Sequence, residues 1–105
     1  MSIPTDENRD LLTVVATMRA QSGQESELRA VLEGLVAPTR EENGNVAYAL
    51  HQAPNDPAIF YFYEVWETQA DLEAHLGGPG VQAALGRLGE LVDGEVVIQP
   101  LFRIA

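Results

Sequence analysis

The sequence predicts an α+β domain of the ferredoxin-like type, in which a split β-α-β arrangement forms a four-stranded antiparallel sheet with helices on one face. Segments with strand and helix patterns follow one another in the order strand, helix, strand, strand, helix pair, strand. The length of 105 residues suits one hydrophobic core. We therefore expect a loose N-terminal arm, residues 1–10, followed by a single domain, residues 11–105.

The first half of the chain contains one predicted strand and the clearest helix. Leu11 to Ala20 forms the strand, and its adjacent valines indicate burial on both faces. Ser22 followed by Glu25 has the spacing of a capping box, which predicts the start of the helix. The helix then presents an apolar stripe that Pro38 breaks or offsets. The stripe consists of Leu28, Val31, Leu32, Leu35 and Val36.

A hairpin is predicted in the middle of the chain. Asn45 to Gln52 forms its first strand, the turn-forming residues 53–58 follow, and Ile59 to Trp66 forms its second strand. Alternation along the second strand points two sets of side chains to opposite faces of the sheet, and both sets are largely apolar or aromatic. One face receives Phe60, Phe62, Glu64 and Trp66, and the other receives Ile59, Tyr61, Tyr63 and Val65.

The remaining segments complete the predicted fold. Thr68 followed by Asp71 resembles a capping box and predicts a short helix. A glycine-rich turn separates this helix from another over residues 81–92. The last strand is predicted from Glu95 to Ile104, where Pro100 favours an edge position or a bulge.

Strands with apolar side chains on both faces predict self-association. The helices can cover one face of a four-stranded sheet, and an uncovered apolar face would be larger than soluble monomers tolerate. A chain of this length also buries a comparatively small fraction of its surface alone, so a partner subunit would add stability. We therefore expect a homodimer in which two copies stack sheet to sheet.

Composition and charge exclude several classes of function. Sixteen acidic residues against six basic ones give a formal charge of −10, which argues against binding to nucleic acid or to anionic membranes. The absence of cysteine excludes disulfides, thiolate catalysis and cysteine-ligated metals. No apolar run is long enough for a membrane span, and the first ten residues are too polar for a signal peptide, so we expect a cytoplasmic protein.

The best candidate site combines Glu64 and Trp66, at the end of a strand, with His75 on the helix that follows. If that helix packs on the sheet, the imidazole is carried towards the face that holds the carboxylate and the indole. An imidazole that titrates near neutral pH can act as a general base. Flat, apolar side chains nearby would contact an aromatic ligand. The candidate substrate contacts are Phe60, Phe62, Tyr48 and Asn45.

Each candidate also has a purely structural interpretation. His75 could be a helix-end histidine that interacts with the C-terminal dipole, and Trp66 could be a core anchor. Glu64 could hold the tautomer of His75 or accept a substrate hydroxyl, or it could be a strand-end carboxylate bound to backbone or arginine. The sequence leaves these alternatives open, and it predicts no metal ligands.

Three segments resemble the antibiotic biosynthesis monooxygenase superfamily and, within it, the small quinol monooxygenases. They are L-L-T-V-V-A at Leu11 to Ala16, E-E-N-G-N-V-A-Y at Glu41 to Tyr48, and Y-E-V-W-E-T-Q-A-D-L-E-A-H-L at Tyr63 to Leu76. The resemblance covers roughly Leu11 to Ile104. It implies a dimeric α+β barrel with a ligand cavity between the helices and the sheet of each subunit.

The resemblance also implies chemistry. Its expected activity is the oxygenation by O2 of aromatic quinols, phenols or polyketide-like substrates without flavin, haem or metal, with Glu64, Trp66 and His75 as the carried-over catalytic positions. Two alternatives remain. The chain could be a non-catalytic dimeric module that binds a small aromatic metabolite, or a haem-binding or haem-degrading protein with His75 as axial ligand. Haem-degrading relatives carry an asparagine where Thr17 stands here.

Overall fold

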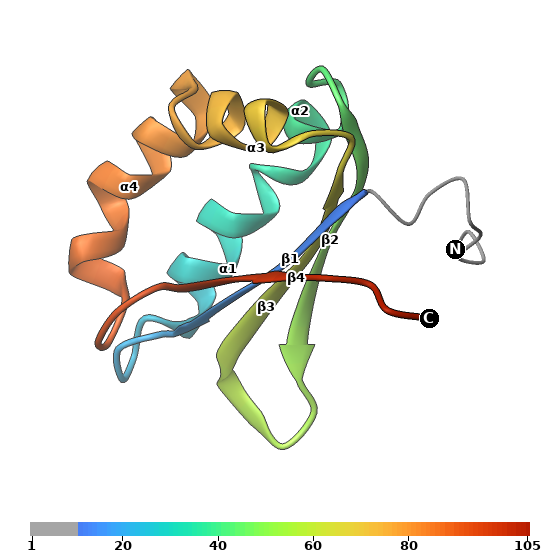
Figure 1. Cartoon of the computed structure of the whole chain (residues 1–105). Helices are drawn as coiled ribbons and strands as arrows, with labels where there is room; N and C mark the ends of the chain where they lie inside the picture. Colours follow the sequence, from blue (N-terminus) through green and yellow to red (C-terminus); the bar gives the residue numbers. More distant parts are fainter. Residues whose placement is uncertain (1–10) are drawn as a thin grey trace.

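The computed structural model describes residues 11–105, so the predicted N-terminal arm, residues 1–10, lies outside the described residues. A four-stranded antiparallel sheet in the strand order β2-β3-β1-β4 carries the helices on one face (Figure 1). The ferredoxin-like α+β prediction is therefore confirmed. The elements are β1 (Leu12–Arg19), α1 (Glu25–Glu33), α2 (Val36–Arg40), β2 (Asn45–Ala53), β3 (Asp56–Trp66), α3 (Gln69–Leu76), α4 (Pro79–Leu91) and β4 (Val97–Leu101).

The two central strands carry the core on the face that the helices cover. β1 pairs with β3 along its whole length, from Leu12 opposite Trp66 to Arg19 opposite Ile59. The predicted alternation of β3 is confirmed, because every side chain assigned to the helix-covered face is buried. These side chains are Phe60, Phe62, Glu64 and Trp66. Leucines of α1 pack onto the same core cluster, so the amphipathic stripe of the first helix meets the sheet as its pattern indicated.

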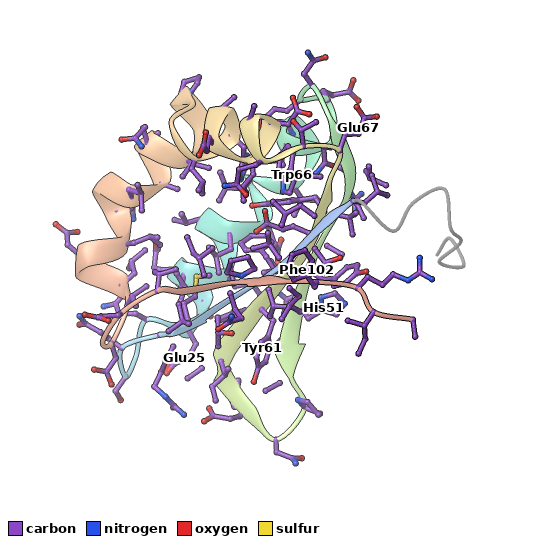
Figure 2. All side chains as sticks on the ribbon, in the orientation of Figure 1. Glu25, His51, Tyr61, Trp66, Glu67 and Phe102 are labelled. Carbon is purple, nitrogen blue, oxygen red and sulfur yellow. The ribbon has the colours of Figure 1, made fainter. Side chains whose placement is uncertain are left out.

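No element among residues 11–105 covers the opposite face of the sheet, which is called the uncovered face below. Tyr63, Val97 and Leu101 lie on this face and are 39%, 52% and 43% exposed. Beyond the end of β4, Phe102 is 93% exposed (Figure 2). The prediction that apolar side chains project from both faces of the sheet is therefore confirmed. An antiparallel sheet with one hydrated face would carry polar residues at these positions.

The start of α1 differs from the capping-box prediction. Its N-cap is Gln24, whose side chain makes no capping hydrogen bond. Gly23 has a φ of +87°, and its N–H donates to the Glu25 carboxylate at 3.1 Å. The prediction that Ser22 and Glu25 form a capping box is wrong, because this positive-φ turn moves the start of the helix along the chain.

Other boundaries are shifted as well, and β3 already begins at Asp56, within the turn predicted over residues 53–58. The first helix ends before Pro38 is reached, and this proline lies in the first turn of α2, where its missing N–H would have no helical acceptor. The strand predicted from Glu95 to Ile104 is shorter, because its ladder with β1 stops where Leu101 pairs with Thr13. β4 does form an edge of the sheet, as Pro100 indicated. Among residues 11–105, no helix combines the length and apolarity needed to cross a bilayer.

Candidate active site

Two side chains at the end of β3 form a buried polar pair. Glu64 and Trp66 are two residues apart on a strand, so they point to the same face of the sheet. The Trp66 Nε1–H donates to the Glu64 Oε1 over 3.0 Å, and the two residues are 0% and 5% exposed. The indole therefore satisfies one oxygen of the buried carboxyl group.

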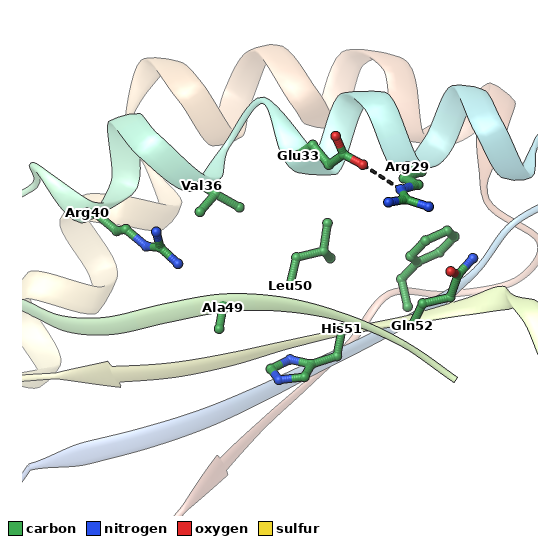
Figure 3. A pocket seen from close by; sticks show the side chains of 9 residues that line it. Arg29, Glu33, Val36, Arg40, Ala49, Leu50, His51 and Gln52 are labelled. Carbon is green, nitrogen blue, oxygen red and sulfur yellow. Dashed lines mark hydrogen bonds and ion pairs between the residues drawn. The ribbon is translucent and has the colours of Figure 1, made fainter. Parts of the chain in front are cut away.

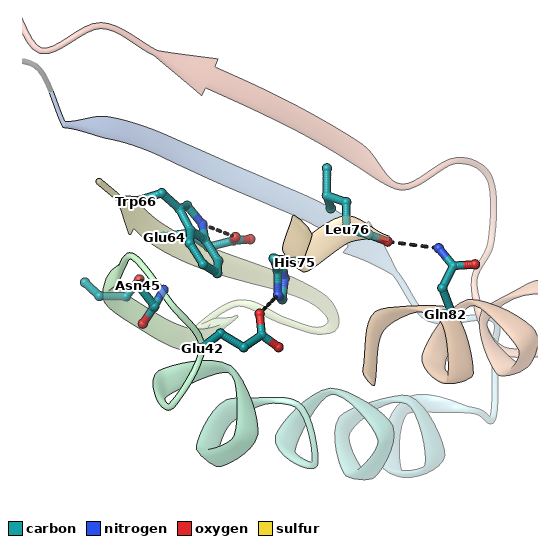
Figure 4. A network of polar contacts seen from close by, with 8 residues as sticks. Glu42, Asn45, Glu64, Trp66, His75, Leu76 and Gln82 are labelled. Carbon is teal, nitrogen blue, oxygen red and sulfur yellow. Dashed lines mark hydrogen bonds and ion pairs between the residues drawn. The ribbon is translucent and has the colours of Figure 1, made fainter. Parts of the chain in front are cut away.

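The next helix brings an imidazole to this pair. The Thr68 hydroxyl caps α3 by accepting the N–H of Asp71 at 3.1 Å, so the predicted capping interaction is confirmed. Leu72 and His75 are the buried residues of this helix, and they face the sheet together. The imidazole lies 4.8 Å from the Trp66 ring between centroids, with the planes tilted by 35° (Figure 4).

A second carboxylate, which was not among the predicted site residues, binds this imidazole. Glu42 follows the end of α2, and its Oε1 lies 2.7 Å from His75 Nδ1. A carboxylate accepts a hydrogen bond, so it places the proton of neutral His75 on Nδ1 and leaves the lone pair of Nε2 free. The expectation that Glu64 could hold this tautomer is wrong, because Glu64 bonds to the indole instead.

A glycine turn explains how Glu42 reaches α3. Gly44 has a φ of +76°, a conformation that side chains disfavour. A Cβ at this position would lie 2.0 Å from the Asp71 Oδ2, so the turn and α3 approach more closely than any other residue would permit. The close approach sets Glu42 beside His75. An E-N-G sequence that starts with a carboxylate and ends in a positive-φ turn was the signal for this residue.

Aromatic rings close the site on the β2 side. Tyr48 stacks on Phe62 with ring centroids 4.6 Å apart, and its ring meets His75 edge-on at 5.4 Å. Burial raises the pKa of Tyr48 well above its ordinary range; the nearby Glu64 charge adds to the shift, and a hydrogen bond with Thr39 opposes it. The phenol therefore stays neutral and can serve as a hydrogen-bond donor.

Burial also shifts the pKa of Glu64, the buried carboxyl of β3. Burial raises the pKa of Glu64, while the hydrogen bond from Trp66 and the neighbouring His75 oppose the rise. The environment thus shifts this carboxyl towards its protonated form. Glu64 differs in this respect from a carboxylate that is solvated on a helix face.

The other two predicted contacts, Asn45 and Phe60, have different surroundings. The Asn45 side-chain amide donates to the backbone carbonyl of Ala47 at 3.1 Å, so it is engaged locally. Phe60 lines a separate cleft at the sheet edge. Among residues 11–105, no group of three histidine or acidic side chains gathers as potential metal ligands.

Two of the cavities lined by residues 11–105 bear on access to the site. One, of about 530 Å³, lies between α1–α2 and the edge strand β2 (Figure 3). The other, of about 330 Å³, is a groove between α1–α2 and α4, and Thr39 and Glu42 lie on its wall. Neither is lined by Glu64, Trp66 or His75, whose rings and carboxyl pack against one another. The groove nevertheless reaches the imidazole through one residue, Glu42.

Comparison with known proteins agrees with this architecture. PA3566 from Pseudomonas aeruginosa is 35% identical and superposes with a TM-score of 0.87 over 91% of this chain and 96% of that chain. Rv0793 from Mycobacterium tuberculosis, provisionally named a monooxygenase, superposes with a TM-score of 0.85 at 25% identity over 90% of this chain and 96% of that chain. In sequence it is 28% identical over 86% of this chain and 88% of its own length.

A further relative is longer than this chain. The uncharacterised protein sll1783 from Synechocystis sp. is 26% identical over 67% of this chain, and the match spans 48% of that protein, about half its length. A sequence profile described as antibiotic biosynthesis monooxygenase matches residues 11–87, which include both carboxylates, the indole and the imidazole of the site. The chain therefore belongs to the antibiotic biosynthesis monooxygenase family.

Proposed function

We propose that this protein is a cofactor-independent monooxygenase that acts on an aromatic quinol or phenol. The observation that carries the proposal is the buried imidazole of His75, which is held by a carboxylate on Nδ1 and is in contact with two aromatic rings. The provisional monooxygenase name of the mycobacterial relative supports the reaction class.

The reaction requires an electron-rich substrate. Triplet O2 reacts slowly with closed-shell molecules, and deprotonation of a quinol hydroxyl makes electron transfer to O2 favourable. A naphthoquinol and O2 then yield a hydroxynaphthoquinone and water: one oxygen atom replaces a ring hydrogen, and the other leaves as water. All four electrons that O2 accepts come from the substrate, so the protein supplies a base and a shaped apolar environment.

The residues divide these tasks. His75 Nε2 takes the substrate proton, and Glu42 stabilises the imidazolium that forms, as the carboxylate of a catalytic triad does. Trp66, Phe62 and Tyr48 offer flat apolar contact to the substrate ring. The substrate approaches along the groove between α1–α2 and α4, because that cavity shares Glu42 with the imidazole.

We also propose that two copies form a homodimer through the uncovered sheet face. The described strands point no acidic side chain to the middle of this face, although the chain carries a formal charge of −10. Two like-charged copies can therefore meet there without direct repulsion, and each buries apolar side chains such as Tyr63 and Leu101. A cytoplasmic location also remains a prediction.

Oxygen uptake with a reduced naphthoquinol tests the activity. Wild-type protein should consume O2 faster than the substrate alone, and ¹⁸O2 should place one labelled oxygen in the product. His75→Ala should reduce the rate about 10²–10⁴-fold, the usual contribution of a general base. His51→Ala is the matched control, because this second histidine is exposed on β2 and should leave the rate unchanged.

Two results would count against the proposal. Turnover that survives His75→Ala would remove the assigned base. Saturable quenching of Trp66 fluorescence by a naphthoquinol, without O2 uptake above the protein-free rate, would identify a module that binds an aromatic metabolite and does no chemistry.

A further inference from the structure

We propose that the cleft at the sheet edge is a second ligand site, which binds a small organic carboxylate with a flat apolar body through Arg40. The cleft has a volume of about 530 Å³ and lies between α1–α2 and β2 (Figure 3). It is separate from the imidazole site, since its lining includes neither the buried carboxyl nor the imidazole. The proposal goes beyond the monooxygenase activity and does not require it.

Among residues 11–105, Arg40 has no carboxylate partner. Three other arginines pair with acidic side chains: Arg19 with Asp56, Arg29 with Glu33, and Arg87 with Glu27. Among residues 11–105, Arg40 forms no such ion pair, although the chain carries a formal charge of −10. An uncompensated guanidinium in so acidic a protein is a ready binding group for an anion from outside the chain.

The guanidinium is also held in place. Its Nε donates to the backbone carbonyl of Tyr48 on β2 at 3.0 Å. This bond uses one of the five donors of the group and leaves the two terminal nitrogens for a ligand. A carboxylate matches that pair of nitrogens with two parallel hydrogen bonds, and preorganisation lowers the entropy lost on binding.

Part of the cleft lining is apolar, and the rest is polar or charged. Val36, Leu50 and Phe60 belong to the apolar part, and Figure 3 shows Leu50 on the helix side of β2, with the His51 ring on the opposite side of the strand. β2 is an edge strand, and the carbonyl of Tyr48 points away from β3 to reach Arg40. By the alternation of an antiparallel ladder, the peptide groups of Leu50 point the same way and offer an N–H donor at the cleft.

The opposite end of the cleft carries no free charge. Arg29 and Glu33 are one helical turn apart on α1 and neutralise each other (Figure 3). The guanidinium of Arg40 can therefore pair with a ligand that carries a single negative charge. The net charge of the chain disfavours multiply charged anions, so a monocarboxylate fits better than a phosphate.

Binding is measured with 2-naphthoate as the probe, followed by the backbone amide signals of Leu50 and Phe60 in NMR spectra of the full chain. Wild type should show saturable shifts, and Arg40→Gln should weaken binding at least about tenfold, as expected for one charge-assisted contact. The affinity of Arg40→Lys should lie between those of wild type and Arg40→Gln, because lysine keeps the positive charge but cannot form two parallel hydrogen bonds to a carboxylate. Arg87→Gln removes the same charge from an exposed helix position and should bind within about twofold of wild type.

Neutral 2-naphthamide should bind wild type and Arg40→Gln equally weakly, and inorganic phosphate at matched ionic strength should not displace 2-naphthoate. Equal affinities of the Arg40→Gln and Arg87→Gln proteins would overturn the proposal, as would an absence of saturable shifts. Shifts that appear only in protein made monomeric would show that a second copy covers the cleft, which also overturns it. None of these measurements depends on O2 consumption, so this site and the proposed activity can fail separately.

Discussion

Replacement of Gly44 by alanine tests the turn that carries Glu42 to His75. The φ of this residue is +76°, a region that costs an L-residue about 1–2 kcal/mol. The new Cβ would lie 2.0 Å from the Oδ2 and 2.7 Å from the Cβ of Asp71, so the Asp71 side chain must move. That movement breaks its 2.8 Å hydrogen bond from the Thr68 hydroxyl, worth about 0.5–1.5 kcal/mol. The free energy of unfolding should therefore fall by about 2–3 kcal/mol.

Urea unfolding of Gly44→Ala beside Gly23→Ala separates the two causes. Gly23 has a φ of +87°, and no atom lies within 4 Å of the position that its Cβ would take. The Gly23→Ala protein should lose only the backbone contribution, about 1–2 kcal/mol. For a domain of this size, the Tm of Gly44→Ala should drop by roughly 10–20 °C. A Gly44→Ala protein as stable as Gly23→Ala would refute the close approach of the turn to α3.

Two more predictions concern the buried carboxyl and the uncovered face. The folded state raises the pKa of Glu64 above its ordinary value of 4.5. The free energy of unfolding of wild type should therefore fall as the pH rises from 4.5 to the raised pKa of the folded state. Glu64→Gln keeps a hydrogen-bond acceptor for Trp66 and does not titrate. In urea unfolding, the free energy of unfolding of Glu64→Gln relative to wild type should therefore increase from pH 4 to pH 7. An equal difference between the two proteins at both pH values contradicts this prediction. Tyr63→Glu should shift sedimentation from dimer to monomer, whereas Leu85→Glu, on the exposed side of α4, should not. Wild type that sediments as a monomer at micromolar concentration excludes the dimer.

The periodicity of apolar residues in the sequence was sufficient to predict most of the fold. Alternation along β3 separated its two faces, and the period of α1 identified the helix stripe, because both repeats follow from backbone geometry. The errors arose where one residue sets a turn. Gly23 adopts a positive φ that the Ser22–Glu25 spacing does not reveal, and the end of β4 depends on where its partner strand stops.

Sequence periodicity predicted only some of the residues of the candidate site. Glu64, Trp66 and His75 come from consecutive elements, so strand alternation and helical spacing place them near one another. Glu42 is 33 residues from His75 along the chain, and its contact depends on how closely the α2–β2 turn approaches α3. Periodicity carries no information about such a tertiary distance. Gly44, two residues after Glu42, was the local sign in the sequence that a tight turn lies there.

The two carboxyls of the site have different environments, and the difference separates their roles. Glu42 has a side chain that is 33% exposed and faces His75 Nδ1, which is the arrangement of a charged partner for an imidazolium. Glu64 is buried, and burial together with the charge of Glu42 raises its pKa. The surroundings of Glu64 therefore favour its protonated form. In the proposed reaction, His75 is the base, Glu42 is its charged partner and Glu64 is a candidate proton donor, which is the division that acid–base chemistry on a hydroxylated ring requires.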